Sequence, residues 1–183
     1  MFESDYEING THATQLKYLV NDAKAFDRYI DVYMAAAAVG CLYGRKSQKT
    51  SSTDRARIYA DAFNTERIKC NELFKTVILS DKSYNWTQEN KLNICFRFRD
   101  KLDEKAIPPV SQDEVETMQE ALELFNSYVY GGIEILYDNF STTASIGQDE
   151  AVDYAYKTIF DQRSLIDIEA NKQDDSQLFT PEY

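Results

Sequence analysis

The hydrophobic pattern of residues 111–140 is that of one long amphipathic helix. Apolar side chains recur there every three or four residues, which places them on one face of a helix. Ser111 and Glu114, directly after a pair of prolines, have the spacing of a capping box that begins a helix. The apolar positions are Val115, Met118, Leu122, Phe125, Val129, Leu136 and Phe140. We expect this helix to form the centre of the fold.

Two adjacent glycines, Gly131 and Gly132, lie in the second half of this helix. Gly132 falls on the apolar face, where a large side chain is expected. A glycine inside a helix costs about 1 kcal/mol relative to alanine. Either a neighbouring backbone packs close enough to offset that cost, or the helix breaks at this point.

Residues 26–46 predict a second helix whose buried face changes from large to small residues. The face begins with Phe26 and Ile30 and ends with Gly40 and Gly44. Small residues allow another helix to approach closely. We therefore expect Gly40 to meet the region of Gly132, and we interpret four glycines as helix-packing residues: Gly40, Gly44, Gly131 and Gly132.

Weaker patterns predict further helices at 12–21, 64–80, 87–102 and 148–162. Thr87 is the expected N-cap of the third of these, and the residues expected inward are Leu92, Cys95, Phe96, either Phe98 or Arg99, and Leu102. In the last, the residues expected inward are Val152, Ala155, Tyr156 and Ile159.

The predicted fold class is all-α, a single compact bundle-like domain of about six helices around the long central helix 111–140. Residues 1–11 are expected to form an N-terminal arm that contacts the body through Phe2 and Tyr6. The helical domain spans 12–162, and 163–183 form an acidic, mobile C-terminal tail.

The net charge of −11 is unevenly distributed along the 183 residues. Residues 1–10 carry −3 and residues 149–183 carry −6, whereas the body between them carries −2. Acidic ends are typical of solvated tails, and they also suit docking on a basic partner. A protein that imitates DNA would spread its acidic residues over the body, so a DNA-mimic inhibitor is the weaker alternative.

The sequence lacks the residue sets on which common catalytic and metal sites depend. His12 is the only histidine, and we expect it at the surface or at a helix cap rather than in a nucleophile pair. Three cysteines lie within apolar helical runs, at Cys41, Cys70 and Cys95. They form no CxxC pair, so neither a disulfide framework nor a zinc site is expected. Acid pairs such as Glu134 and Asp138 are expected on solvated faces. We therefore predict no enzyme, no metal and no cofactor.

Residues 45–57 form a basic, Ser/Thr-rich stretch that we expect to be an exposed loop, since Gly44 is a plausible helix end. Its cations are Arg45, Lys46, Lys49, Arg55 and Arg57, against the single acid Asp54. Such side chains supply sequence-independent affinity for phosphate backbones. These five residues are candidate DNA or phosphate contacts, and an ordinary solvated loop is the alternative.

Localisation follows from two further sequence features. The first ten residues, MFESDYEING, are acidic and do not have the pattern of a signal or transit peptide. No apolar run approaches the roughly 20 residues that cross a bilayer. We expect a cytoplasmic protein.

Two phrases of the sequence resemble a known group. The first contains Phe26, Tyr29, Asp31, Val32, Ala36, Ala37, Gly40, Gly44 and Arg45; the second contains Tyr128, Gly131, Gly132, Ile133, Glu134, Ile135, Leu136 and Tyr137. Together they resemble small accessory proteins found beside bacterial DNA-phosphorothioation (Dnd) and related anti-phage systems. The third subunits of Lamassu-type complexes, also small and helical, are similar too.

This resemblance implies a non-enzymatic adaptor of a prokaryotic defence complex. Its partner would be a DNA-processing ATPase, an SMC-like protein or a nuclease, and DNA would be contacted directly or through that partner. The 13 tyrosines suit such a role, because tyrosine is favoured in interfaces. The alternative is a DNA-contacting regulator that uses the basic residues of 45–57.

Overall fold

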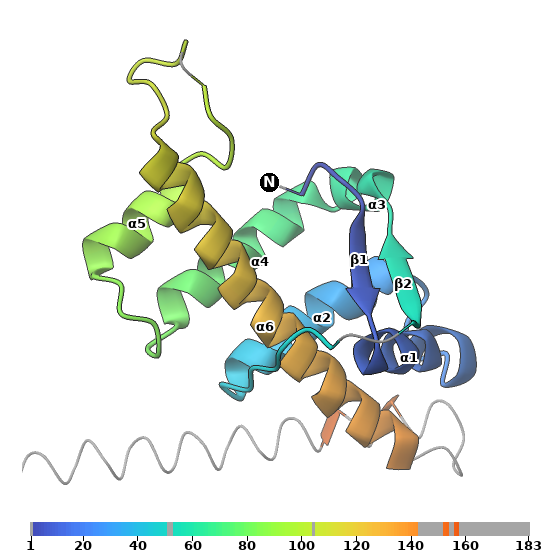
Figure 1. Cartoon of the computed structure of the whole chain (residues 1–183). Coiled ribbons are helices and arrows are strands. Elements are labelled where there is room, and N and C mark those ends of the chain that lie inside the picture. Colours follow the sequence, from blue (N-terminus) through green and yellow to red (C-terminus); the bar gives the residue numbers. More distant parts are fainter. Residues whose placement is uncertain (1, 51–52, 104, 143–151, 154–155, 158–183) are drawn as a thin grey trace, which may run out of the picture.

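The computed structural model describes residues 2–50, 53–103, 105–142, 152–153 and 156–157. The elements are β1 (Tyr6–Asn9), α1 (Thr11–Lys17), a π-helical turn η1 (Tyr18–Asp22), α2 (Tyr29–Leu42), β2 (Arg55–Ile58), α3 (Ala60–Thr65), α4 (Arg67–Ser80), α5 (Gln88–Phe96) and α6 (Gln112–Thr142). α6 runs across the molecule, with α5 on one side and the two strands on the other (Figure 1). The predicted fold class, a compact and mostly helical domain around one long helix, is confirmed.

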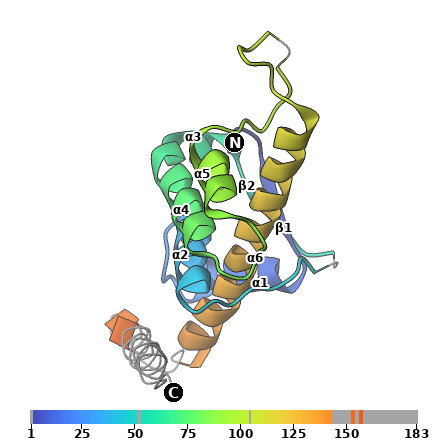
Figure 2. The ribbon, with the colours of Figure 1, turned by 90° about the vertical axis from the view of Figure 1, so that its left-hand side faces the viewer.

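α6 begins at the predicted capping box. Ser111 Oγ accepts a hydrogen bond from the Glu114 amide at 3.2 Å, and Glu114 Oε2 accepts one from the Ser111 amide at 3.0 Å. The helix continues without interruption through Gly131 and Gly132, so it does not break there. Its apolar face packs against α1, η1, α2, α4 and α5, and Figure 2 shows α2, α4 and α5 gathered along one side.

A short antiparallel sheet joins the N-terminal residues to the body. In this sheet Tyr6 of β1 is paired with Ile58 of β2, and Ile8 with Ala56. The side chains of Ile8, Ala56 and Ile58 are buried. The sheet corrects two predictions, because residues 1–11 are not only an arm and residues 45–57 are not entirely a loop. The alternation of polar and apolar residues in Arg-Ala-Arg-Ile is the period of a half-buried strand, and it is the signal that was missed.

Phe2 and Tyr6 contact the body as expected. The Phe2 ring lies 5.6 Å from the ring of Phe63 and 6.0 Å from that of Phe125, measured between centroids. Tyr6 packs edge-on to Tyr33 at 5.7 Å. These rings extend the aromatic core that α6 organises.

The helix predicted at 87–102 begins where expected but ends earlier and turns a different face inward. Thr87 Oγ1 accepts a hydrogen bond from the Asn90 amide at 3.1 Å, and α5 ends at Phe96. Lys91 is buried and its ammonium donates to the carbonyl oxygen of Asp81. Because Lys91 faces inward, Leu92 and Phe96 are exposed, and so is Leu102 beyond the helix. Of the residues predicted inward, Cys95 is buried.

Two other helices differ in extent from their predictions. The pattern at 12–21 corresponds to α1 followed by η1, and the pattern at 64–80 corresponds to the end of α3 and to α4. The chain leaves helical geometry between α3 and α4 at Glu66, whose carboxylate is held by Arg28 at 2.8 Å and Lys69 at 2.7 Å.

Most of the predicted helix 148–162, including Ala155 and Ile159, lies outside the described residues, as does the predicted tail 163–183. Val152, Asp153, Tyr156 and Lys157 are described and helical, and Lys157 pairs with Asp153 at 2.6 Å. Val152 and Tyr156 are 44% and 68% exposed, so the prediction that they face inward is wrong. Within the described ranges, no helix is both long and apolar enough to cross a bilayer.

Candidate functional site

α2 and α6 meet through glycine. A Cβ on Gly40 would lie 2.0 Å from the carbonyl oxygen of Tyr128 and 3.1 Å from the Gly132 nitrogen, and one on Gly132 would lie 1.9 Å from the carbonyl oxygen of Ala36. Real Cβ atoms do not come this close to backbone atoms. The expected contact of Gly40 with the region of Gly132 is therefore present, and it brings two backbones together without leaving room for a ligand.

The other two glycines have different roles. A Cβ on Gly131 would lie 2.2 Å from the carbonyl oxygen of Arg45, so Gly131 packs against the segment that leaves α2. Gly44 packs against no described residue, because none has an atom within 4 Å of its Cβ position. Its φ is +60°, and the amide of Arg45 bonds to the carbonyl of Gly40 at 2.9 Å. Gly44 therefore ends α2 in a Schellman-type turn, and its assignment as a helix-packing residue is wrong.

His12 is 1% exposed, which contradicts the expectation of a surface or capping residue. Its Nε2 lies 3.1 Å from Glu134 Oε1, and its ring lies 4.9 Å from the Tyr130 ring between centroids, with the two planes tilted by 33°. The Arg45 guanidinium holds the other Glu134 oxygen at 2.9 Å, so Glu134 is not simply solvated. Burial raises the pKa of the Glu134 carboxyl, but hydrogen bonds from Ser47, Arg45 and His12 outweigh it and leave the pKa below its ordinary value.

A second buried polar cluster surrounds Asp81, at the end of α4. Its carboxylate accepts hydrogen bonds from the amides of Ser83 (3.0 Å) and Tyr84 (2.7 Å) and from the Tyr128 hydroxyl. Lys46 Nζ lies 3.9 Å away. Burial raises the pKa of Asp81, but these donors lower it below its ordinary value. The Asp81 carboxylate thus joins the end of α4 to the loop that follows it and to α6, which indicates a structural role.

The candidate DNA contacts of residues 45–57 are exposed, but most of them already have acidic partners. Arg45 pairs with Glu134 and Lys46 with Asp81, while Arg55 and Arg57 both pair with Glu7, each at 3.5 Å. Lys49 is exposed and forms no ion pair with any described residue. It borders a hollow of about 450 Å³ between the 47–49 segment and α6. The structure thus places the five cations along one stretch but leaves little of their charge unpaired.

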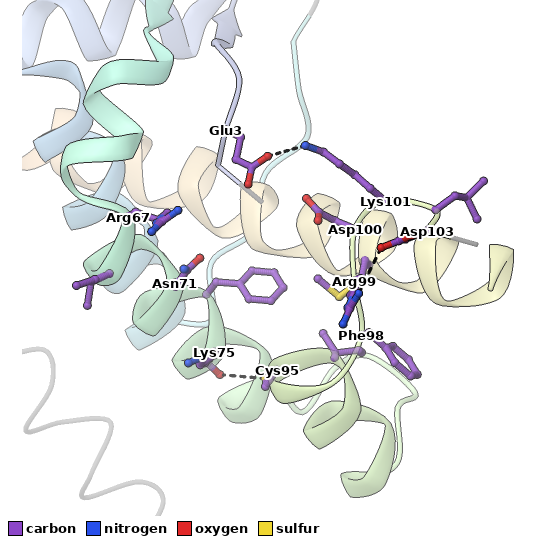
Figure 3. A pocket seen from close by; sticks show the side chains of 15 residues that line it. Glu3, Arg67, Asn71, Lys75, Cys95, Phe98, Arg99, Asp100, Lys101 and Asp103 are labelled. Carbon is purple, nitrogen blue, oxygen red and sulfur yellow. Dashed lines mark hydrogen bonds and ion pairs between the residues drawn. The ribbon is translucent and has the colours of Figure 1, made fainter. Parts of the chain in front are cut away.

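A larger cleft, of about 750 Å³, lies between α4, α5 and the segment that follows α5 (Figure 3). On one wall Arg67, Asn71 and Lys75 follow each other along α4 at intervals of four residues, so they project from one face of that helix. Phe74 of the same helix also lines the cleft. Ile94 from α5 and Met118 from α6 also line it.

The opposite wall comes from residues 98–103. Phe98 and Arg99 face the cleft, and Lys101 bridges to Glu3 across one end of it (Figure 3). Arg99 is paired loosely with Asp103, at 3.6 Å. Along residues 99–103 the lining therefore carries cations and carboxylates alternately, whereas the α4 wall carries the cations Arg67 and Lys75, and the floor is apolar.

Large apolar side chains are exposed around this cleft. Ile68 on α4 is 79% exposed, Leu102 is 59% exposed, and both line the cleft. Phe96, which is 63% exposed, lies beneath the ammonium of Lys75 at 5.2 Å from the ring centroid. Sequence reasoning missed this site. The alternation of aromatic and basic residues in Phe-Arg-Phe-Arg, residues 96–99, is the signal that marks it.

Within the described residues no group of three or more His, Cys, Asp and Glu side chains is arranged to hold a metal ion. The cysteines Cys41, Cys70 and Cys95 are all free thiols. Comparison with known proteins finds no matching family model, no matching curated protein and no matching solved structure. The geometry of the cleft is therefore the main support for a function, and the resemblance to defence accessory proteins stays an expectation from two phrases of sequence.

Proposed function

We propose that this chain is a non-enzymatic accessory subunit that binds a partner protein through the cleft between α4 and α5. The observation that carries the proposal is the exposure of Ile68 and Leu102, two large apolar side chains that line the same cleft. Soluble proteins rarely expose contiguous apolar surface, and where they do it commonly marks an interaction site. Aromatic and arginine side chains, which both occur here, are enriched in protein interfaces.

The partner that the sequence resemblance favours is a DNA-processing ATPase, an SMC-like protein or a nuclease of a bacterial anti-phage defence complex. The chain would bind that protein and regulate it in the cytoplasm. The N-terminal and C-terminal stretches of the sequence are acidic, and carboxylates do not bind DNA phosphates. In an assembly whose other members handle DNA, these stretches would therefore not compete with those members for the DNA.

Affinity purification of the tagged full-length chain from its native host, at low salt, followed by mass spectrometry, tests this proposal. We expect a stoichiometric ATPase, SMC-like chain or nuclease to co-purify and to co-migrate with the chain in size-exclusion chromatography. A chain that stays alone under these gentle conditions would contradict the proposed function.

The DNA-contacting alternative depends on the exposed cations of residues 45–57, of which Lys49 has no acidic partner among the described residues. Gel-shift titration of duplex DNA at low salt tests it, with Lys49→Glu and Arg55→Glu as variants. Salt-sensitive binding that both variants weaken would favour direct DNA contact. No shift by the wild-type chain at low salt would exclude it.

A further inference from the structure

We infer that the cleft between α4 and α5 receives a short segment of the partner that presents one or two carboxylates beside an aliphatic or aromatic anchor. The inference rests on the proposed function and adds to it the chemistry of the bound segment. It follows from the volume, the apolar floor and the charge arrangement of the cleft.

The floor explains the apolar anchor. Phe74, Ile94 and Met118 are each 3% exposed or less and close the bottom of the cleft. The volume of about 750 Å³ is within the range of cavities that enclose several ligand groups. Exposed Ile68 and Leu102 stand at its rim. An apolar side chain inserted here would pack on the floor and would remove the exposed rim residues from water, and burial of apolar surface is the main favourable term in association.

The arginines explain the carboxylate. Arg67 is exposed on the α4 wall and forms no ion pair with any described residue. Among the described residues Arg99, on the opposite wall, forms an ion pair only with exposed Asp103, at 3.6 Å, and pairs of that kind contribute little. A guanidinium binds a carboxylate through two parallel hydrogen bonds. A carboxylate entering between these walls would find a partner on either side.

The acidic residues of the lining argue against nucleic acid. Glu3, Asp100 and Asp103 lie among the four cations, so the lining has a net charge of only about +1. A phosphodiester chain carries a charge at every nucleotide and would place several of them against these carboxylates. A protein segment with one or two acids, spaced by apolar residues, matches the alternation instead.

The experiment is selection of a random 12-residue peptide library, displayed on phage, against the immobilised full-length chain. We expect enriched peptides to contain Asp or Glu within a few residues of Leu, Ile, Phe or Trp. The leading peptide is then synthesised with a fluorophore and titrated by anisotropy. Arg67→Glu and Ile68→Asp should each weaken its binding at least tenfold, which corresponds to about 1.4 kcal/mol.

Matched controls separate binding from folding. Tyr59 lies outside the cleft and its side chain is 62% exposed. Tyr59→Asp, like Ile68→Asp, places an acidic side chain at a helix N-terminus, where the helix dipole tolerates a negative charge. Lys49→Glu reverses an exposed charge elsewhere. Both controls should bind the peptide within about twofold of the wild type, and all four variants should keep the wild-type circular dichroism spectrum. Repeating the selection on Arg67→Glu should shift the consensus from acidic to basic residues.

Four results would overturn the inference. The first is no enriched consensus, or a basic one, with the wild-type chain. The second is peptide binding that survives both cleft substitutions. The third is binding of a fluorescent oligothymidylate of 15 nucleotides that the same substitutions abolish, which would assign the cleft to single-stranded nucleic acid. A host partner that co-purifies equally well with both cleft variants would also overturn this inference, yet the adaptor function itself would stand.

Discussion

Gly40 of α2 lies directly against the carbonyl oxygen of Tyr128 in α6, so that a Cβ on Gly40 would come within 2.0 Å of that oxygen. Gly132, one turn further along α6, lies in the same way against Ala36. The two helices therefore touch backbone to backbone, over positions separated by about ninety residues of sequence.

Alanine at either glycine should destabilise the protein. A methyl group at Gly40 or Gly132 meets backbone atoms that cannot rotate away, and overpacking of this kind costs typically 1–3 kcal/mol. Alanine regains up to about 1 kcal/mol of helix propensity, so we expect a net loss of about 1–2 kcal/mol for each variant. Urea unfolding followed by circular dichroism measures the change in midpoint.

Gly44 is the matched control for these substitutions. Its Cβ position is open and its φ is +60°, a conformation that asparagine also adopts. Gly44→Asn should therefore change the free energy of unfolding by less than about 0.5 kcal/mol. If Gly132→Ala stabilised the chain instead, the close approach of α2 and α6 would be disproved.

The hydrogen bond from Tyr128 to Asp81 should be coupled to the stability of the whole fold. Asp81→Asn keeps the shape of the side chain but loses the charge that four neighbouring donors face, so we expect a loss of about 2–3 kcal/mol. Tyr128→Phe alone should cost about 1–2 kcal/mol. The double variant should lose less than the sum, as a double-mutant cycle measures. Asp138→Asn, at an exposed position of α6, should be nearly neutral. If the losses of the two single variants added up to that of the double variant, the hydrogen bond between Tyr128 and Asp81 would be disproved.

Glu134 should make the free energy of unfolding depend on pH in the acid range. Although burial raises its pKa, donors from Ser47, Arg45 and His12 set it below the ordinary value. A carboxyl whose pKa is lower in the folded state than in the unfolded state stabilises the fold. Its contribution is complete at pH values above the unfolded-state pKa of about 4.3, and it is lost as the pH falls through the folded-state pKa.

The measurement compares Glu134→Gln with the wild type. At pH 7 we expect Glu134→Gln to be less stable by about 1–3 kcal/mol, because the arginine and the buried histidine lose a charged partner. The difference should shrink steadily below about pH 4.3. Glu123→Gln, exposed on the same helix, should show no such trend. A difference that stayed constant from pH 7 to pH 3 would refute this role of Glu134.

The cysteines should react slowly in the folded protein. Burial raises the pKa of Cys70 and of Cys95 to about 11 and also raises that of Cys41, so few thiolates exist at pH 8. Because the thiolate is the reacting species, we expect labelling by Ellman's reagent to be at least tenfold slower than in urea. If the native chain rapidly released three equivalents of the coloured thiol product of the reagent, the burial of the cysteines would be contradicted.

The parts of the fold that the sequence predicts well depend on nearby residues or on strict periodicity. The capping box of Ser111 and Glu114 and the N-cap at Thr87 each involve partners three residues apart, and both are present. The long apolar period of α6 identified the central helix, and the small residues of α2 identified its close neighbour.

The features that sequence reasoning missed depend on partners far along the chain. His12 is buried because Glu134, 122 residues later, accepts its hydrogen bond. Lys91 faces inward only because the carbonyl of Asp81 receives its ammonium, and this contact turned α5 away from its predicted face. The candidate cleft was missed for the same reason, since Arg67 and Arg99 belong to different predicted helices and line one cleft only in the folded molecule.

The pairing of α2 with α6 has a consequence for the making of this protein. The α2 residues emerge from the ribosome long before the residues of α6 have been synthesised. Until α6 is present, α2 cannot bury its alanines and glycines. Because domains generally fold as units, the emerging chain must wait in an open state for most of its synthesis, during which chaperones have access to it.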